Sequence, residues 1–243
     1  MIPPSTAATY PSPLDRLLNM GEPPSINDWP DYVTQYGLTE HHVPELIRMA
    51  TDAALHCCDG DDRYVWAPVH AWRALGQLNA SAAIQPLITL LRRIDDEDDD
   101  WVGEEMPRVF GMIGPAAIEP LTAYLADNAN PQYARIAARG GLVNIAEIFP
   151  DHRDRVAGFL ADQLRRGTPD DACANGFLVS ALIDLKAVEH KLVMEQAHAR
   201  QCVDLSICGD WDDVQVELGL KSPTKILSTL TRAKLLDAIH GVV

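Results

Sequence analysis

The chain has 243 residues, of which 47% are hydrophobic, and this content excludes an intrinsically disordered chain. Its 20 Lys and Arg residues and 35 Asp and Glu residues give a formal net charge of −15. Because such a chain repels a polyanion, nucleic acid is an unfavourable partner, and a basic protein or peptide suits the charge better.

Residues 1–37 form a Pro-rich lead, in which six of the first 24 residues are prolines that interrupt any long helix. We expect one or two helical turns over Leu14 to Leu18, and a short helix near 31–36 that Gly37 ends. The first residues lack the basic and apolar stretches of a secretory signal. No apolar run in the chain reaches the roughly 20 residues that cross a bilayer. The sequence therefore predicts a cytoplasmic protein.

Thr39 is expected to cap a helix that runs to about Leu55 and has one apolar face. The next residues, 57–62, have the composition of a loop. The chain has five cysteines, an odd number, and no Cys-x-x-Cys pair. We therefore predict reduced thiols rather than a disulfide framework or a thiolate zinc site.

The middle of the chain contains an internal repeat. Four residues recur 35 positions later, namely Trp66, Arg73, Leu75 and Gly76 as Trp101, Arg108, Phe110 and Gly111. A second segment, residues 82–87, recurs 34 positions later as residues 116–121. Similarity at such a period is typical of stacked-repeat proteins.

Helical hairpins are predicted from residue 65 onward, because apolar residues recur at i, i+3, i+4 and i+7. The best-defined helices cover 65–76 and 84–91 in one unit, and 106–113 and 118–125 in the next. Two looser pairs follow, over 136–143 with 156–164 and from about 175 to 192. No segment here alternates with period two, so no sheet is expected. The six acidic residues 95–100 are expected to be a solvated loop between units rather than a cation site.

The end of the chain differs from the repeats. We expect residues 206–243 to comprise an acidic segment around Trp211 and a C-terminal helix that begins after Ser222 and Pro223. That helix would cap the stack. The predicted organisation is thus a lead over 1–37, repeats over 38–205 and a capping region over 206–243.

The two best copies share a Gly at the end of the first helix and a Pro early in the second. With these features, segments 65–76 and 110–118 resemble HEAT-like repeats of the phycobilisome lyase (PBS lyase) type. A tetratricopeptide repeat fits less well, because Asn79 and Pro107 stand where Tyr and Trp are expected. The resemblance implies an all-α fold, a right-handed α-α superhelix or HEAT-like α-solenoid of about four to five helical hairpins.

The whole chain also resembles a bacterial group of small HEAT-repeat proteins of unassigned function. Some members of that group end in a Cys-rich zinc motif, whereas no cysteine follows Leu220 here. The lyase name describes the repeat shape, and an activity does not transfer with a fold.

Seven repeat residues are candidates for a partner-binding surface, namely Trp66, His70, Arg73, Trp101, Arg108, Arg135 and Arg139. The first three are expected to share one helix face. Two interpretations of the arginines stay open. They either pair with acids of the neighbouring unit in an internal ladder or present guanidinium groups to an acidic ligand. The candidate acids of such a ladder are Glu104, Glu105, Asp127 and Glu147.

Alanine at Arg73 distinguishes these two interpretations. We expect it to weaken partner binding without changing the melting temperature if Arg73 belongs to a binding surface. Unfolding of the variant would instead assign Arg73 to the ladder.

No nucleophile elbow, phosphate loop or dinucleotide fingerprint is present. No His-Glu dipeptide of the kind found in HEAT-like di-iron oxygenases occurs either. We predict a non-catalytic protein-binding scaffold or assembly factor, with no catalytic residue, metal ligand or cofactor. One alternative, implied by the resemblance, is a bilin or cofactor lyase or its auxiliary subunit, which a roomy apolar cleft would favour. A second is a nucleic-acid-binding HEAT-repeat protein, which would need a continuous basic stripe. The sequence leaves the oligomeric state open.

Overall fold

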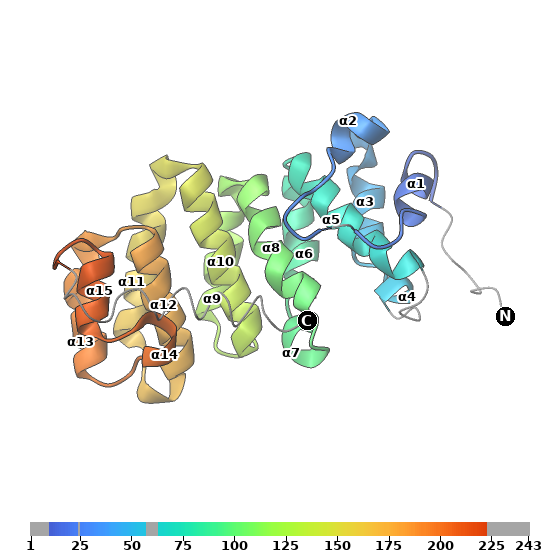
Figure 1. Cartoon of the computed structure of the whole chain (residues 1–243). Coiled ribbons are helices and arrows are strands. Elements are labelled where there is room, and N and C mark those ends of the chain that lie inside the picture. Colours follow the sequence, from blue (N-terminus) through green and yellow to red (C-terminus); the bar gives the residue numbers. More distant parts are fainter. Residues whose placement is uncertain (1–9, 24, 57–62, 223–243) are drawn as a thin grey trace. The chain divides into compact units, whose positions relative to one another are not determined.

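The computed structural model describes residues 10–23, 25–56 and 63–222 (Figure 1). Within these ranges the chain is all-helical and contains no strand, in agreement with the predicted fold class. It forms two compact units, of which the first ends at Phe159 and the second begins at Leu160. Each unit is described by itself.

The lead contains the two short helices that the sequence predicts, α1 (Leu14–Leu18) and α2 (Tyr32–Tyr36). The Asp31 carboxylate accepts a hydrogen bond from the backbone N–H of Thr34 and so caps α2. Gly37 ends α2 with a φ of 64°, a left-handed conformation that glycine adopts without steric cost. Both helices contact helix α5 (Ala67–Gln77) of the first repeat, so they are part of unit 1.

The predicted helix over 39–55 is broken into a 3-10 turn (Glu40–His42), α3 (Val43–Ala50) and α4 (Ala53–His56). Thr39 begins it as expected, through a capping box with His42. The prediction of one continuous helix is wrong because Asp52 starts a new turn. Its carboxylate accepts one hydrogen bond from the N–H of Ala54 and another from the hydroxyl of Tyr10. The predicted loop over 57–62 lies outside the described residues.

Three long helices are the first helices of successive repeats in unit 1, namely α5 (Ala67–Gln77), α8 (Asp100–Ile113) and α10 (Gln132–Ile148). A short 3-10 turn (Arg63–Trp66) precedes α5. The second helices of the first two repeats are α6 (Ile84–Leu90) and α9 (Ile118–Ala126). Helix α5 packs against α8 and α8 against α10, side by side in chain order. Neighbouring repeats therefore share one apolar interior.

A three-residue 3-10 turn precedes each second helix, including α11 (Arg153–Arg166) and α13 (Lys191–Ala199). Turns of the same length also precede α3 and α12 (Ala172–Asp184). In chain order the turns before α6, α9, α11 and α13 are Ser81–Ala83, Pro115–Ala117, Pro150–His152 and Val188–His190.

Gly76 and Gly111 occupy equivalent places, since each lies where its helix meets the first helix of the next repeat, and at Gly111 the approach leaves no room for a Cβ. A Cβ on Gly76 would lie 3.5 Å from the Cα of Val109, and one on Gly111 would lie 2.7 Å from the Cβ of Asn144. In both cases the contacted residue is 33 positions further along the chain (109 − 76 and 144 − 111). The sequence repeat is therefore also a repeat in packing.

Alanine at Gly111 is expected to lower the free energy of unfolding by about 1–3 kcal/mol, because the added methyl group forces α8 and α10 apart. Gly158, also inside a helix, is the matched control, as a Cβ there meets nothing within 4 Å. Alanine at Gly158 should stabilise the fold by about 0.5–1 kcal/mol through helix propensity alone. Urea titration measures both. Equal effects of the two substitutions would contradict the close packing of α8 against α10.

The acidic run over 95–100 is more ordered than the predicted loop. Its first residues belong to α7 (Arg93–Asp96). The Asp95 carboxylate accepts hydrogen bonds from the backbone N–H groups of Tyr133 and Ala134, at 3.0 and 2.8 Å, and so caps α10 of the next repeat. Asp99 caps α8 and pairs with Arg93 at 2.9 Å. These carboxylates stabilise helix ends.

Unit 2 continues the helical pattern from α11 (Arg153–Arg166), which contains the boundary, through four further helices. These are α12 (Ala172–Asp184), α13 (Lys191–Ala199), α14 (Leu205–Cys208) and α15 (Trp211–Glu217). The acidic segment around Trp211 is thus itself helical, with a capping box between Asp210 and Asp213. The predicted helix after Ser222 lies outside the described residues.

The described helices were also compared with the length and apolarity that a bilayer requires. No single one of them is long and apolar enough to cross it. Helix α8 and the segment Pro115–Ala126 meet the criterion only together, and a bend of 116° separates them.

Candidate partner-binding site

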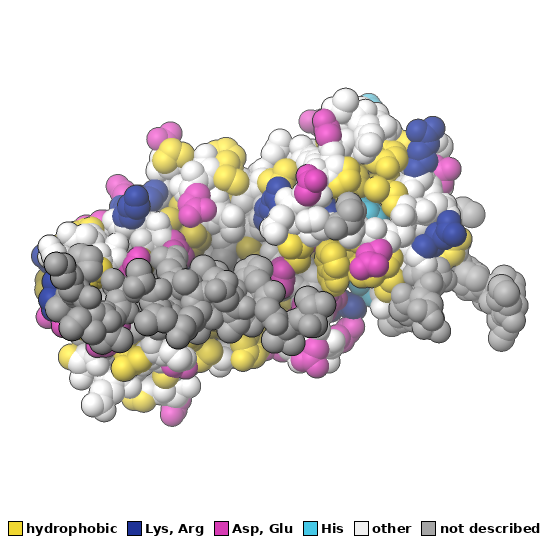
Figure 2. Space-filling model, viewed as in Figure 1, with side chains coloured by type: hydrophobic (Ala, Val, Ile, Leu, Met, Phe, Trp, Pro, Cys, Tyr) yellow, Lys and Arg dark blue, Asp and Glu magenta, His cyan; other side chains and the backbone are white. Residues whose placement is uncertain are grey.

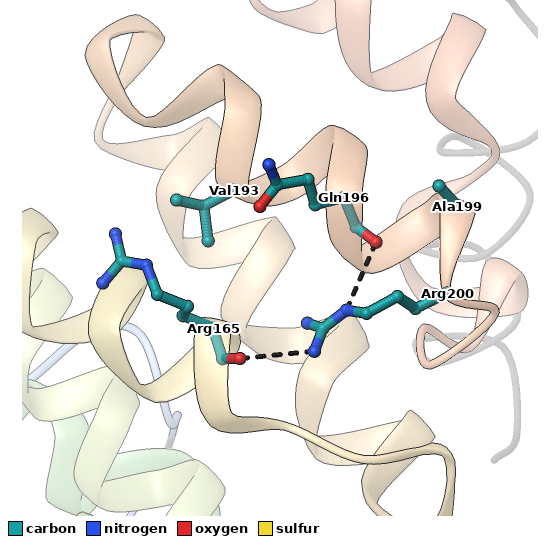
Figure 3. A pocket seen from close by; sticks show the side chains of 5 residues that line it. All are labelled: Arg165, Val193, Gln196, Ala199 and Arg200. Carbon is teal, nitrogen blue, oxygen red and sulfur yellow. Dashed lines mark hydrogen bonds between the residues drawn. The ribbon is translucent and has the colours of Figure 1, made fainter.

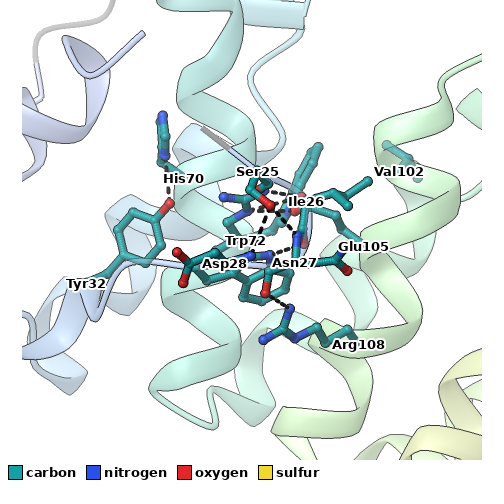
Figure 4. Close-up of polar contacts among 12 residues, drawn as sticks. Ser25, Ile26, Asn27, Asp28, Tyr32, His70, Trp72, Val102, Glu105 and Arg108 are labelled. Carbon is teal, nitrogen blue, oxygen red and sulfur yellow. Dashed lines mark hydrogen bonds and ion pairs between the residues drawn. The ribbon is translucent and has the colours of Figure 1, made fainter. Parts of the chain in front are cut away.

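The chain's own lead covers the face of α5 that carries His70 and Arg73 (Figure 4). We call residues 19–23 and 25–31 the strap. It joins α1 to α2, crosses α5 and reaches α8 (Figure 1).

Side chains of the repeats hold the strap by its backbone carbonyl groups. The donor–carbonyl pairs are His70 Nε2 with Gly21 at 2.7 Å, Arg73 Nη2 with Ser25 at 3.0 Å, Arg108 Nη1 with Asn27 at 3.0 Å and Gln77 Nε2 with Pro30 at 2.7 Å. Three of the donors lie on α5 and one on α8.

Arg73 also forms an ion pair with Glu105 of α8, and both side chains are fully buried. The Arg73 Nε lies 2.9 Å from Glu105 Oε2, and its Nη2 donates to Oε1. Trp72 Nε1 donates to the same carboxylate at 2.7 Å. Because Glu105 belongs to the next repeat, Arg73 makes the contact that the internal-ladder interpretation predicts. The same guanidinium also holds the strap.

Aromatic rings pack against the equivalent arginines of the two repeats and against each other. The guanidinium carbon of Arg108 lies 4.1 Å from the centre of the Trp29 ring of the strap, and that of Arg73 lies 5.0 Å from it. Trp66 and Trp101 meet edge to face, with ring centres 5.1 Å apart. Stacking of cations on aromatic faces thus adds to the hydrogen bonds that hold the strap.

His70 is held neutral between the strap and α2. Its Nε2 carries the proton, since the Gly21 carbonyl can only accept, so its Nδ1 accepts from the Tyr32 hydroxyl at 2.8 Å. Burial lowers the pKa of His70 to about 4, with a smaller contribution from the positive charge of Arg73, although the Gly21 hydrogen bond acts in the opposite direction. Burial likewise raises the pKa of Tyr32 to about 12.

A family model for the PBS lyase HEAT-like repeat matches residues 70–93. The chain therefore contains a HEAT-like repeat. The matched segment starts at His70 and runs through α6, so the repeat that it identifies is the one whose first helix holds the strap. Comparisons with curated proteins and with solved structures each found no match to this HEAT-like repeat protein.

The structure brings five of the seven sequence-predicted residues close together, and it leaves two apart. The five are Trp66, His70, Arg73, Trp101 and Arg108. His70, Arg73 and Arg108 contact the strap, whereas Trp66 meets Trp101, whose ring centre lies 5.8 Å from the Arg73 guanidinium carbon. His70 and Arg73 are fully buried and so are not open to a partner while the strap is in place. Arg135 and Arg139 lie on α10, where Arg135 Nε donates to the Leu125 carbonyl at 3.1 Å. Partner binding by these residues stays a prediction.

Sequence reasoning missed the strap residues themselves. Trp29 and Pro30 lie in a lead that has the composition of a linker, and nothing nearby in the chain indicates what they contact. The one available signal was an isolated tryptophan in a Pro-rich segment, since such a large apolar ring is seldom left in solvent.

One Cys–His pair lies outside this site, and such a pair can supply a thiolate nucleophile. Cys208 Sγ lies 4.0 Å from His198 Nε2 in unit 2. Burial raises the pKa of Cys208 to about 12, and the charges of Asp204 and Asp213 add to this shift. The thiol is therefore protonated at neutral pH, and the pair lacks the thiolate that nucleophilic catalysis requires.

A cavity of ≈ 250 Å³ in unit 2 is lined by Arg165, Val193, Gln196, Ala199 and Arg200 (Figure 3). Its volume is below the roughly 300–1,000 Å³ of typical small-molecule pockets. Arg200 already donates to the carbonyls of Arg165 and Leu164, both at 3.3 Å, and Arg165 pairs with Asp162. Within the part of the chain that the structure describes, no cluster of three or more His, Cys, Asp or Glu residues could hold a metal ion.

Proposed function

We propose that this HEAT-like repeat protein is a non-catalytic scaffold or assembly factor that binds another protein or peptide in the cytoplasm. The strap is the observation that carries the proposal. Repeat side chains hold an extended segment by its carbonyl groups, and these contacts do not depend on the side chains of that segment.

The proposed architecture is a right-handed superhelix of about four to five hairpins over 38–205, with the lead over 1–37 and the capping region over 206–243. Two features support it, namely the packing of α5, α8 and α10 in chain order and the equivalent places of Gly76 and Gly111. Arrays of this kind present an extended surface, which suits an elongated partner.

No specific observation favours either alternative, the bilin or cofactor lyase or the nucleic-acid-binding protein. The cavity in unit 2 is small for a tetrapyrrole, and its arginines are engaged. Nucleic-acid binding would need a continuous basic stripe. On the face of the described residues that Figure 2 presents, Lys and Arg side chains instead form separate groups among acidic and apolar ones.

Site-specific photo-crosslinking in cells of the source organism tests the proposal. p-Benzoylphenylalanine would replace one exposed residue at a time, namely Arg108 on α8, Gln85 on α6 or Leu192 on α13. We expect one protein to be linked reproducibly at one of these positions and not at all three. The protein so identified should then bind the purified chain in a titration.

The same experiment separates the alternatives. Adducts that contain nucleic acid would favour the nucleic-acid-binding alternative. A chain that acquires a covalently bound bilin on incubation with a free bilin would favour the lyase alternative. Absence of a protein adduct at all three positions would contradict the scaffold proposal.

A further inference from the structure

We propose that the face of α5 and α8 beneath the strap is the docking surface for the partner, which brings an extended segment containing a Trp-Pro pair and displaces the strap. This inference rests on the proposed scaffold function and deepens it, because it names the surface and the chemistry of the segment that binds there.

The first step concerns what the face recognises. His70, Gln77 and Arg108 each donate to a carbonyl group of the strap, and Arg73 does so while it stays paired with Glu105. Side-chain donors that read main-chain carbonyls accept any extended segment of suitable path. The face is therefore a peptide-binding surface in its chemistry, and the strap is its resident ligand (Figure 4).

The second step concerns specificity. Trp29 is the strap side chain that stacks on two arginines of successive repeats. Its indole N–H donates to the Ile26 carbonyl at 2.7 Å, which fixes the ring within a local turn. Pro30 follows and offers its carbonyl to Gln77. A segment that replaces the strap needs the same pair, an aromatic ring for the guanidinium groups and a proline-restricted backbone after it.

The third step concerns exchange. In the described strap residues, no backbone–backbone hydrogen bond joins the strap to α5 or α8. Asn27 and Asp28 are exposed, and Trp29 is half-buried. The strap can therefore leave without disturbing a helical hydrogen bond, as the exchange of a ligand requires.

The charged residues at the edge of the strap indicate the net charge of the partner segment. Arg108 is exposed at the edge of the strap, and the strap carries Glu22 and Asp28. A neutral or acidic segment fits this edge better than the basic partner that the net charge of the chain predicts.

Fluorescence anisotropy of a labelled peptide with the sequence of residues 19–32 tests the proposal on the full chain. Trp29→Ala in the chain weakens the strap, so this variant should bind the peptide at least about tenfold more tightly than the unmodified chain. Alanine in place of the tryptophan of the peptide should abolish that gain. In the Trp29→Ala chain, Arg108→Ala should weaken binding, whereas Arg92→Ala, an exposed arginine outside the face, should not.

Two outcomes would overturn the proposal. One is a Trp29→Ala chain that keeps its helical circular dichroism but does not bind the peptide. The other is a dimer of the unmodified chain that the peptide dissociates, because the face would then belong to the strap of a second copy. If the Trp29→Ala chain does not fold, hydrogen exchange of the unmodified chain tests the displacement of the strap instead. Excess peptide should speed exchange at the Tyr32 amide of the unmodified chain, whose N–H donates to Gln77 Oε1 of α5, and unchanged exchange would refute displacement.

Failure here and failure of the scaffold proposal are distinguishable. A protein linked at Gln85 or Leu192, together with a peptide that does not bind, would leave the scaffold function standing and remove only this docking surface.

Discussion

Replacement of Arg73 by methionine is expected to lower the free energy of unfolding by about 3–5 kcal/mol, because it leaves the Glu105 carboxylate buried without its counter-charge. Trp72 would still donate to Glu105, but one neutral donor does not compensate an isolated buried charge. The strap would also lose its contact at the Ser25 carbonyl. Urea titration followed by circular dichroism measures the effect.

Arg108→Met is the matched control, since Arg108 holds the equivalent position in the next repeat but is exposed. It should cost no more than about 1 kcal/mol. Adding Glu105→Leu to Arg73→Met should recover part of the lost stability, because no charge then remains in the interior. Equal losses for Arg73→Met and Arg108→Met would contradict a buried Arg73–Glu105 pair. Because Arg73 is buried in this ion pair, Arg73→Ala is also expected to lower the melting temperature, which is the outcome that assigns Arg73 to the ladder.

Acid is expected to destabilise unit 1 through His70. The pKa of His70 is about 4 in the folded protein and about 6.5 in the unfolded chain, so between these values the unfolded state binds more protons. The stabilisation is complete above pH 6.5 and is lost as the pH falls from 6.5 to 4. The shift of about 2.5 pKa units corresponds to a loss of about 3 kcal/mol.

His70→Gln isolates this contribution. Glutamine can still donate to Gly21 and accept from Tyr32, but it does not titrate. The difference in unfolding free energy between pH 7 and pH 4 should be about 3 kcal/mol smaller in the variant than in the unmodified chain. His56, whose pKa burial also lowers, remains in both proteins and cancels in the comparison. Parallel pH profiles of the two chains would show that His70 is not buried in its neutral form.

The helices and the repeat could be predicted from sequence because their signals are local. Amphipathic periodicity places α5, α6 and α9 within about two residues of their observed bounds and gives the end of α8, but it starts α8 at 106 rather than at Asp100. The glycines at 76 and 111 marked equivalent places before any packing was known. The break at Asp52 escaped because one of its two hydrogen bonds comes from Tyr10, 42 residues away.

The candidate site was predictable only in part. Repetition of Trp and Arg identified the residues on one side of it, and the ladder interpretation identified Glu105 among four acids. The strap could not be predicted, because its contacts with the repeats join residues 44 or more positions apart and leave no periodic trace. The shared face of Trp66, His70 and Arg73 was expected to be open for this reason, whereas His70 and Arg73 are fully buried and Trp66 is half-buried.

The most direct measurement is an intramolecular photo-crosslink from position 29. With p-benzoylphenylalanine in place of Trp29, irradiation of the dilute purified chain should link this residue to peptides of α5 or α8 within one molecule, as mass spectrometry would show. Links only to other parts of the chain, or only between two molecules, would contradict a strap that the HEAT-like repeats hold on their own surface.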